Sequence, residues 1–129
     1  MSPGKKILVV EDDYMSALLL KENLGLWGFQ ICGHASFADE AVSLAENARP
    51  DVVLIDAKLR GELRGPWAAK EILARFDIPV IIISGYPEAE IRKHPGLERA
   101  AFMDKSMEME KLKDLIDSIT GGNQATAGC

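Results

Sequence analysis

The sequence predicts an α/β fold, a doubly wound five-stranded parallel sheet in which a (βα) unit is repeated five times. Apolar runs recur along the chain, and stretches with the period of an amphipathic helix separate them. The apolar runs cover residues 6–10, 29–33, 51–55, 79–83 and 100–103. Because parallel strands are joined by right-handed crossovers, this alternation places helices on both faces of the sheet.

The apolar runs differ in strength. KILVV, DVVLI and PVIII are nearly continuous and rich in β-branched residues, which is typical of strands buried on both faces of a parallel sheet. FQICG and the final run, AAFM, are weaker. We therefore expect these two strands to lie nearer the edges of the sheet.

Start and stop signals bound the helices between these strands. Gly28 follows the first helical stretch and ends it, and Ser36 with Asp39 three residues later forms a capping-box pattern for the second. Pro66 suits the first turn of a third helix. A short helix is expected at 88–93, and glycines at 121–122 end the last helix.

The composition indicates a single domain. A chain of 129 residues can bury a sizeable core, and we expect this domain to cover residues 1–120, followed by a flexible tail at 121–129. The net charge of −5 gives no support for a nucleic-acid partner. No segment approaches the ~20 apolar residues of a membrane span. Cys32 and Cys129 form no motif, which favours a reduced, cytoplasmic protein.

Polar side chains follow four of the predicted strands. Glu11 and Asp12 come after the first, Asp56 ends the third, Ser84 ends the fourth and Lys105 follows the fifth. Any one of them alone is usually a turn residue, a helix cap or a solvated charge. Because functional crevices in such sheets lie at the carboxyl ends of the strands, the combination predicts a site.

The residue types suit phosphoryl chemistry. Two or three carboxylates with a backbone oxygen can hold Mg²⁺, which prefers oxygen ligands. An Asp beside the cation can act as a nucleophile toward a phosphoryl group. The metal, a lysine ammonium and a hydroxyl can then neutralise the transferring oxygens.

Four segments resemble the receiver domains of response regulators in two-component signalling. They are KKILVVEDDYMSALLLKENL, DVVLIDAKLRG, PVIIISGY and AAFMDKS. Each segment is weak evidence alone, but their order and spacing together are specific. The resemblance covers residues 5 to about 119 and implies the flavodoxin-like strand order 2-1-3-4-5.

The resemblance also implies roles for the site residues. Asp56 would be the phosphoacceptor and Lys105 would pair with the phosphoryl group. Asp12 would bind Mg²⁺ directly, Glu11 would bind it through water, and Lys58 would offer its backbone carbonyl.

Further residues match positions that regulate receivers. Ser84 would bond a phosphoryl oxygen, and Phe102 occupies the position of the switch aromatic. Lys58 and Tyr86, two residues beyond the acceptor and the hydroxyl, match the positions that tune the lifetime of the phosphoryl group. Asp13, the remaining carboxylate, is expected to cap the first helix.

The chain departs from the family pattern in two loops. Arg60 stands where a proline is common, and the segment GELRG is a residue longer than usual. Ser106 follows Lys105 where the family usually has a proline, commonly after a cis bond. The segment from Ser84 to Gly96, through which receivers commonly signal, is also unusual in sequence.

The predicted function is that of a stand-alone receiver. A sensor histidine kinase or phosphotransfer protein would phosphorylate Asp56, and an unknown downstream protein would bind the monomeric or weakly dimeric domain. The protein would not be an enzyme, apart from autodephosphorylation.

Three alternatives remain. A degenerate receiver would bind partners without phosphorylation. An Asp-nucleophile phosphatase usually carries a second acid where Lys58 stands here. A flavodoxin-like cofactor binder needs a phosphate-cradling loop where this chain has EDDY.

Overall fold

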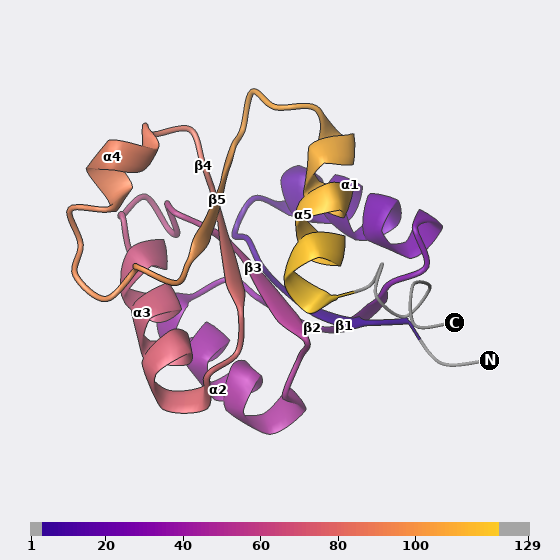
Figure 1. Cartoon of the computed structure of the whole chain (residues 1–129), viewed down its shortest axis with the longest axis horizontal. Coiled ribbons are helices and arrows are strands. Elements are labelled where there is room, and N and C mark those ends of the chain that lie inside the picture. Colours follow the sequence, from indigo (N-terminus) through magenta and orange to yellow (C-terminus); the bar gives the residue numbers. More distant parts are fainter. Residues whose placement is uncertain (1–3, 122–129) are drawn as a thin grey trace.

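Five parallel strands form one sheet in the computed structural model, which describes residues 4–121. The strand order is β2-β1-β3-β4-β5, as the family resemblance predicted, and the two weaker runs form its edges (Figure 1). The strands are β1 (Lys6–Val10), β2 (Gln30–Ala35), β3 (Val52–Asp56), β4 (Val80–Ser84) and β5 (Ala101–Asp104).

The three strands after β2 lie one residue later than the apolar runs indicated. As a result Asp56 and Ser84 belong to the last rung of β3 and β4. Asp56 pairs with Ile83, and Ser84 pairs with Asp104 of β5. The sheet therefore holds the acceptor candidate and the hydroxyl on rigid backbone at the same edge.

Helices cover both faces of the sheet. In Figure 1, α1 and α5 lie together on one side, and α2, α3 and α4 lie on the other. Side chains of β1 alternate accordingly: Ile7 and Val9 pack with the α1 and α5 residues, and Leu8 and Val10 pack with α2 and α3. The helices are α1 (Tyr14–Leu26), α2 (Ala38–Ala48), α3 (Gly65–Phe76), α4 (Glu88–Ile91) and α5 (Met109–Thr120).

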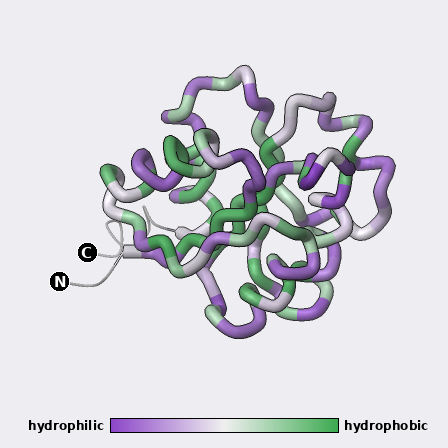
Figure 2. The backbone as a smooth tube through the Cα atoms, turned by 180° about the vertical axis from the view of Figure 1, so that it is seen from behind, coloured by the Kyte–Doolittle hydropathy of each residue, from purple (hydrophilic) through white to green (hydrophobic). Residues whose placement is uncertain are grey.

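Burial on both faces explains the continuous apolar runs. Every residue of β3 is buried, and the hydrophobic colour in Figure 2 concentrates along the strands at the centre of the molecule. Burial of apolar surface contributes about 25 cal/mol per Å², so these strands supply much of the stability that holds the carboxyl edge in place.

Most helix boundaries agree with the sequence signals. Asp13 caps α1, because its Oδ2 accepts a hydrogen bond from the Ser16 N–H at 2.8 Å. Gly28 and Gly121 follow α1 and α5 with positive φ angles of 91° and 71°, a conformation that glycine adopts without strain. Pro66 lies in the first turn of α3.

The predicted capping role of Ser36 is wrong. Helix α2 begins at Ala38, and Phe37 occupies the N-cap position without a side-chain hydrogen bond. The Ser36 N–H instead donates to the Glu40 carboxylate at 2.9 Å. The carboxylate that bonds the chain before α2 is therefore that of Glu40 rather than Asp39. It accepts from the N–H of Ser36, the residue before the N-cap.

Two further expectations concern the second half of the chain. Helix α4 is short, as predicted, and ends at Ile91, before the 94–96 segment. The predicted tail at 121–129 lies, beyond Gly121, outside the described residues. Across residues 4–121, none of the helices has the length and apolar character to cross a membrane.

Candidate functional site

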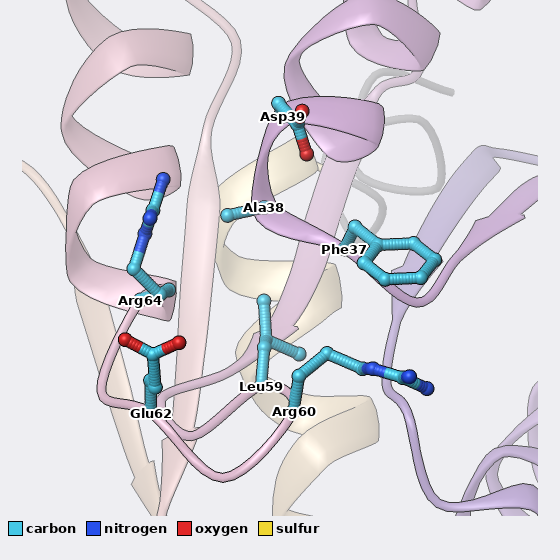
Figure 3. A pocket seen from close by; sticks show the side chains of 7 residues that line it. All are labelled: Phe37, Ala38, Asp39, Leu59, Arg60, Glu62 and Arg64. Atoms are coloured by element: carbon cyan, nitrogen blue, oxygen red, sulfur yellow. The ribbon is translucent and has the colours of Figure 1, made fainter.

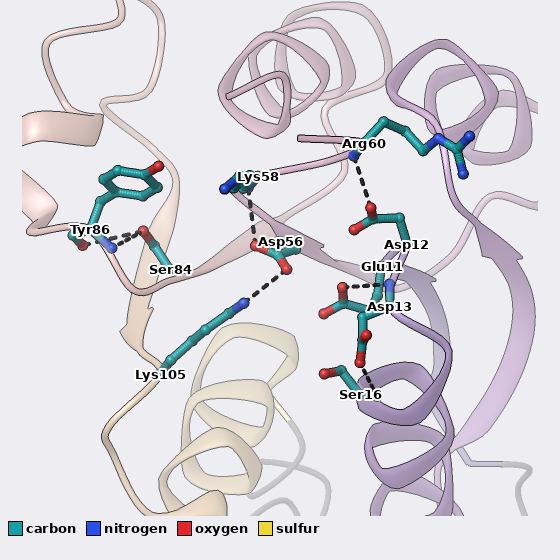
Figure 4. Close-up of polar contacts among 10 residues, drawn as sticks. All are labelled: Glu11, Asp12, Asp13, Ser16, Asp56, Lys58, Arg60, Ser84, Tyr86 and Lys105. Atoms are coloured by element: carbon teal, nitrogen blue, oxygen red, sulfur yellow. Dashed lines mark hydrogen bonds and ion pairs between the residues drawn. The ribbon is translucent and has the colours of Figure 1, made fainter. Parts of the chain in front are cut away.

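Three carboxylates converge where β1 and β3 end. Glu11 and Asp12 follow β1 directly, Asp56 ends the neighbouring β3, and one oxygen from each lies within 4.8 Å of the others. Figure 4 shows these side chains facing one another across the edge of the sheet. The donor set is all oxygen, which suits Mg²⁺.

The Asp56 carboxylate is buried and bonded on both oxygens. Its Oδ2 accepts from the Lys105 ammonium at 2.9 Å, and its Oδ1 accepts from the Lys58 N–H at 3.0 Å. Burial lowers the pKa of Lys105, but the hydrogen bond and charge of Asp56 outweigh it, so that pKa is raised. Lys105 therefore stays cationic beside the acceptor candidate.

Glu11 is a buried carboxylate that lies beside a second negative charge. Its pKa rises from 4.5 to about 7, chiefly because burial penalises the charged form, and the neighbouring Asp56 charge adds to this. A hydrogen bond from the Asp13 N–H, at 3.1 Å from Oε2, partly opposes the rise. A bound cation would offset the repulsion and favour the ionised form.

The Asp12 carboxylate is held by a turn that the sequence did not predict. Its Oδ2 accepts from the Arg60 N–H at 2.9 Å. Leu59 and Glu62 form an antiparallel bridge, and the two residues between them, Arg60 and Gly61, have φ angles of 55° and 79°. This two-residue hairpin with positive φ at both positions is typical of a type I′ turn.

The hairpin also packs against the start of α2. The Arg60 guanidinium lies 4.8 Å from the centre of the Phe37 ring, and a cavity of about 160 Å³ opens between the hairpin and α2. Figure 3 shows Arg60 extending alongside Phe37. The Arg-Gly pair was the available sequence signal, because glycine tolerates the second turn position.

Ser84 lies at the same edge, but its hydroxyl is turned toward the β4–α4 loop. Oγ accepts from the Tyr86 N–H at 2.8 Å, and Ser84 is 3% exposed. Asp56, Lys58, Gly85, Tyr86 and Lys105 line a hollow of about 300 Å³. The Asp56 carboxylate therefore borders an open hollow with room for a group of the size of a phosphoryl group.

Phe102 lies two residues before the end of β5, where it pairs with Ile82 of β4. The Arg92 guanidinium sits 4.2 Å from the centre of its ring. Arg92 also donates to the carbonyl oxygens of Leu97 at 3.0 Å and Ala100 at 3.3 Å. Sequence reasoning missed Arg92, because a cation in a polar segment carries no signal of such contacts.

The structure thus brings most of the predicted site residues together. The carboxylates, the Lys58 backbone and Lys105 form one contact network. The Ser84 hydroxyl bonds the loop, and Phe102 lines a separate hollow of about 140 Å³ that Ser84 also lines. The described residues contain no cis peptide bond, so Lys105 and Ser106 are joined in trans. Lys105 nonetheless reaches Asp56.

A family model matches most of the chain. The model is that of the response regulator receiver domain, and its match covers residues 7–117. The match begins at the second residue of β1 and ends within α5, so it includes β2 to β5 and α1 to α4 in full.

Two curated relatives match about two thirds of the chain. The phyllosphere-induced regulator PhyR of Methylorubrum extorquens is 36% identical over 84 residues, 64% of this chain and 32% of that protein. The transcriptional regulatory protein PdtaR of Mycobacterium tuberculosis is 31% identical over 87 residues, 67% of this chain and 42% of that protein. The matched segment thus spans well under half the length of either relative.

Solved structures share the fold over nearly the whole chain. The signal receiver domain of a modulated diguanylate cyclase from Desulfovibrio desulfuricans has a TM-score of 0.82 and 25% identity, covering 95% of this chain and 98% of that one. The response regulator PhyR from Brucella abortus has a TM-score of 0.79 and 28% identity, covering 96% and 51%.

Proposed function

The chain belongs to the response-regulator receiver family, and on that basis we propose that Asp56 accepts a phosphoryl group in an Mg²⁺-dependent reaction. One observation carries the proposal. The buried Asp56 carboxylate is held by Lys105 and the Lys58 N–H, beside two further carboxylates and under an open hollow.

The transfer exchanges one bond for another. A carboxylate oxygen of Asp56 attacks the phosphorus of a phosphohistidine, a P–O bond forms, and the P–N bond to the imidazole breaks. The leaving imidazole keeps the electron pair and takes a proton. Lys105, 2.9 Å from Asp56 Oδ2, is in place to pair with the equatorial oxygens of the phosphoryl group.

The acid cluster supports the Mg²⁺ requirement. Asp12, Asp56 and the Lys58 carbonyl would hold the ion, with Glu11 bonded through water. Bound there, Mg²⁺ would neutralise charge on the transferring oxygens. Arg60 contributes its backbone N–H to Asp12, so the hairpin orients this carboxylate.

Partners follow from the chemistry. The donor would be a sensor histidine kinase or a phosphotransfer protein, and the output would be contact with a downstream protein. The domain would act as a signalling switch, with autodephosphorylation as its only turnover. Lys58 and Tyr86 line the hollow over the acceptor, where they would control the approach of hydrolytic water.

The switch would begin at Ser84. A phosphoryl oxygen on Asp56 would accept the hydroxyl hydrogen that Ser84 now donates to the Tyr86 carbonyl at 3.2 Å. The hydroxyl would then move away from the Tyr86 N–H, from which it accepts a hydrogen bond at 2.8 Å. The β4–α4 loop would then shift, and Phe102 could turn into the vacated space. Because Arg92 contacts the Phe102 ring and the carbonyls of the α4–β5 loop, that movement would alter the surface around α4.

The test of Mg²⁺-dependent acceptance is intact-mass spectrometry with a small-molecule phosphodonor. The wild type should gain one phosphoryl group in Mg²⁺ and none in EDTA, and Asp12→Ala should gain little in either. Glu22→Ala is the matched control, because Glu22 is an exposed carboxylate on α1. Equal labelling of the wild type in Mg²⁺ and in EDTA would contradict the proposal.

A further inference from the structure

His34 of β2 contacts the backbone that joins the acid pair. Its Nε2 lies 2.8 Å from the carbonyl oxygen of Glu11. Its Nδ1 lies 3.4 Å from the Nζ of Lys21 on α1. The half-buried imidazole therefore bridges α1 and the first residue after β1.

These two neighbours determine which ring nitrogen carries the proton. A lysine ammonium only donates hydrogen bonds, and a backbone carbonyl only accepts them. Nδ1 must therefore present its lone pair to Lys21, and Nε2 must carry the hydrogen that is donated to Glu11. The opposite tautomer would set two donors face to face at Nδ1 and two acceptors face to face at Nε2.

The imidazole completes the hydrogen bonding where the parallel ladder ends. The Glu11 N–H still donates to the Ala35 carbonyl at 2.9 Å. In a continued parallel ladder the Glu11 carbonyl would accept from the backbone two residues beyond Ala35. The chain leaves the sheet there to enter α2 at Ala38, and the His34 side chain supplies a donor instead.

Residues of β2 therefore bond the peptide groups on both sides of Glu11. The Ala35 carbonyl holds the first through the Glu11 N–H, and the His34 side chain holds the second through the Glu11 carbonyl. The second of these is the peptide that joins Glu11 to Asp12, so its orientation determines how the two carboxylates are presented. Asp12 is held from the other side by the Arg60 N–H.

We propose that His34, held in its Nε2–H tautomer by the Glu11 carbonyl and Lys21, is a positioning residue that presents the acid pair to the metal. This inference rests on the proposed Mg²⁺-dependent function, because it assigns a support to that same site. Groups that support a metal site without touching the ion fix the geometry of its ligands.

The tautomer is tested first, by ¹⁵N NMR of the imidazole ring in EDTA. Nε2 should give the shift of a protonated nitrogen, because it donates to the Glu11 carbonyl, and Nδ1 should give that of an unprotonated one. A wild type in the Nδ1–H form would overturn the proposal, and this readout is independent of metal binding.

Metal affinity is tested by titrating Mg²⁺ while following backbone amide shifts near Asp12. His34→Leu should bind Mg²⁺ about fivefold more weakly, the effect of losing one neutral hydrogen bond. His34→Gln should bind close to wild type, because its amide retains a donor. Lys21→Met leaves His34 in place but removes the contact at its Nδ1, so it should also weaken Mg²⁺ binding. This variant provides the test if His34→Leu does not fold.

The outcomes separate this inference from the proposed function. Unfolding in EDTA measures stability, and a purely structural role would lower stability without changing the Mg²⁺ affinity of the folded protein. Equal affinity in wild type, His34→Leu and Lys21→Met would overturn the positioning role. A wild type that binds no Mg²⁺ would overturn the metal site itself, which is a different result.

Discussion

The Glu11 carboxyl should make the metal-free protein less stable as the pH rises. Its pKa is raised from 4.5 to about 7, by burial first and by the Asp56 charge in addition. Between these pH values the folded protein binds a proton that the unfolded chain releases. Stability falls with pH wherever the folded state binds more protons, so this contribution is complete below about pH 4.5 and is lost toward pH 7.

The size of the effect follows from the interval between the two pKa values. The rise from 4.5 to about 7 corresponds to about 3 kcal/mol at the standard conversion. The edge of the sheet opens to solvent, which screens part of this energy, so we expect about 1–2 kcal/mol to be measured.

The perturbation is Glu11→Gln, assayed by urea unfolding in EDTA at pH 5 and pH 8. The amide lacks the charge, and its oxygen can still accept from the Asp13 N–H. The wild type should lose about 1–2 kcal/mol more than the variant between the two pH values. Adding Mg²⁺ at pH 8 should restore the free energy of unfolding of the wild type, because the bound cation replaces the proton. An identical pH dependence in both proteins would refute the reasoning.

The other predictions concern the metal, the phosphoryl lifetime and the switch. Millimolar Mg²⁺ should raise the melting temperature of the wild type by linkage, and Asp12→Ala should show a much smaller rise. Tyr86→Ala should shorten the aspartyl-phosphate lifetime, measured by the loss of intact-mass label, because the exposed Tyr86 lines the hollow beside Asp56. An unchanged lifetime would place Tyr86 outside the path of the attacking water. A beryllofluoride mimic should shift amide NMR signals from Asp56 to Phe102, and Ser84→Ala should confine them to the metal site. Persistence of the distant shifts in Ser84→Ala would contradict a hydroxyl–aromatic coupling.

The fold and the carboxyl edge were predictable because their signals are local. Buried parallel strands must be apolar on both faces, so the runs of β1, β3 and β4 stand out, and parallel strands necessarily bring their last residues to one edge. The placement of Asp56 and Ser84 on the last rung follows directly from this.

Contacts that depend on tertiary geometry could not be predicted. The capping signal at Ser36 was read from spacing alone, whereas the chain uses Glu40 to bond the backbone before α2. Arg92 reads as a surface charge, yet its position over Phe102 depends on where the α4–β5 loop folds. The direction of the Ser84 hydroxyl likewise depends on the loop at Tyr86.

The central claim, that Asp56 is the phosphoacceptor, is tested most directly by the phosphorylation of two matched variants. Asp104 is a suitable control for Asp56, because its carboxylate also ends a strand at this edge but is exposed and bonded to Ser106. Incubated with phosphodonor and Mg²⁺, wild type and Asp104→Asn should each gain one phosphoryl group by intact mass, and Asp56→Asn should gain none. Stoichiometric labelling of Asp56→Asn would contradict the account.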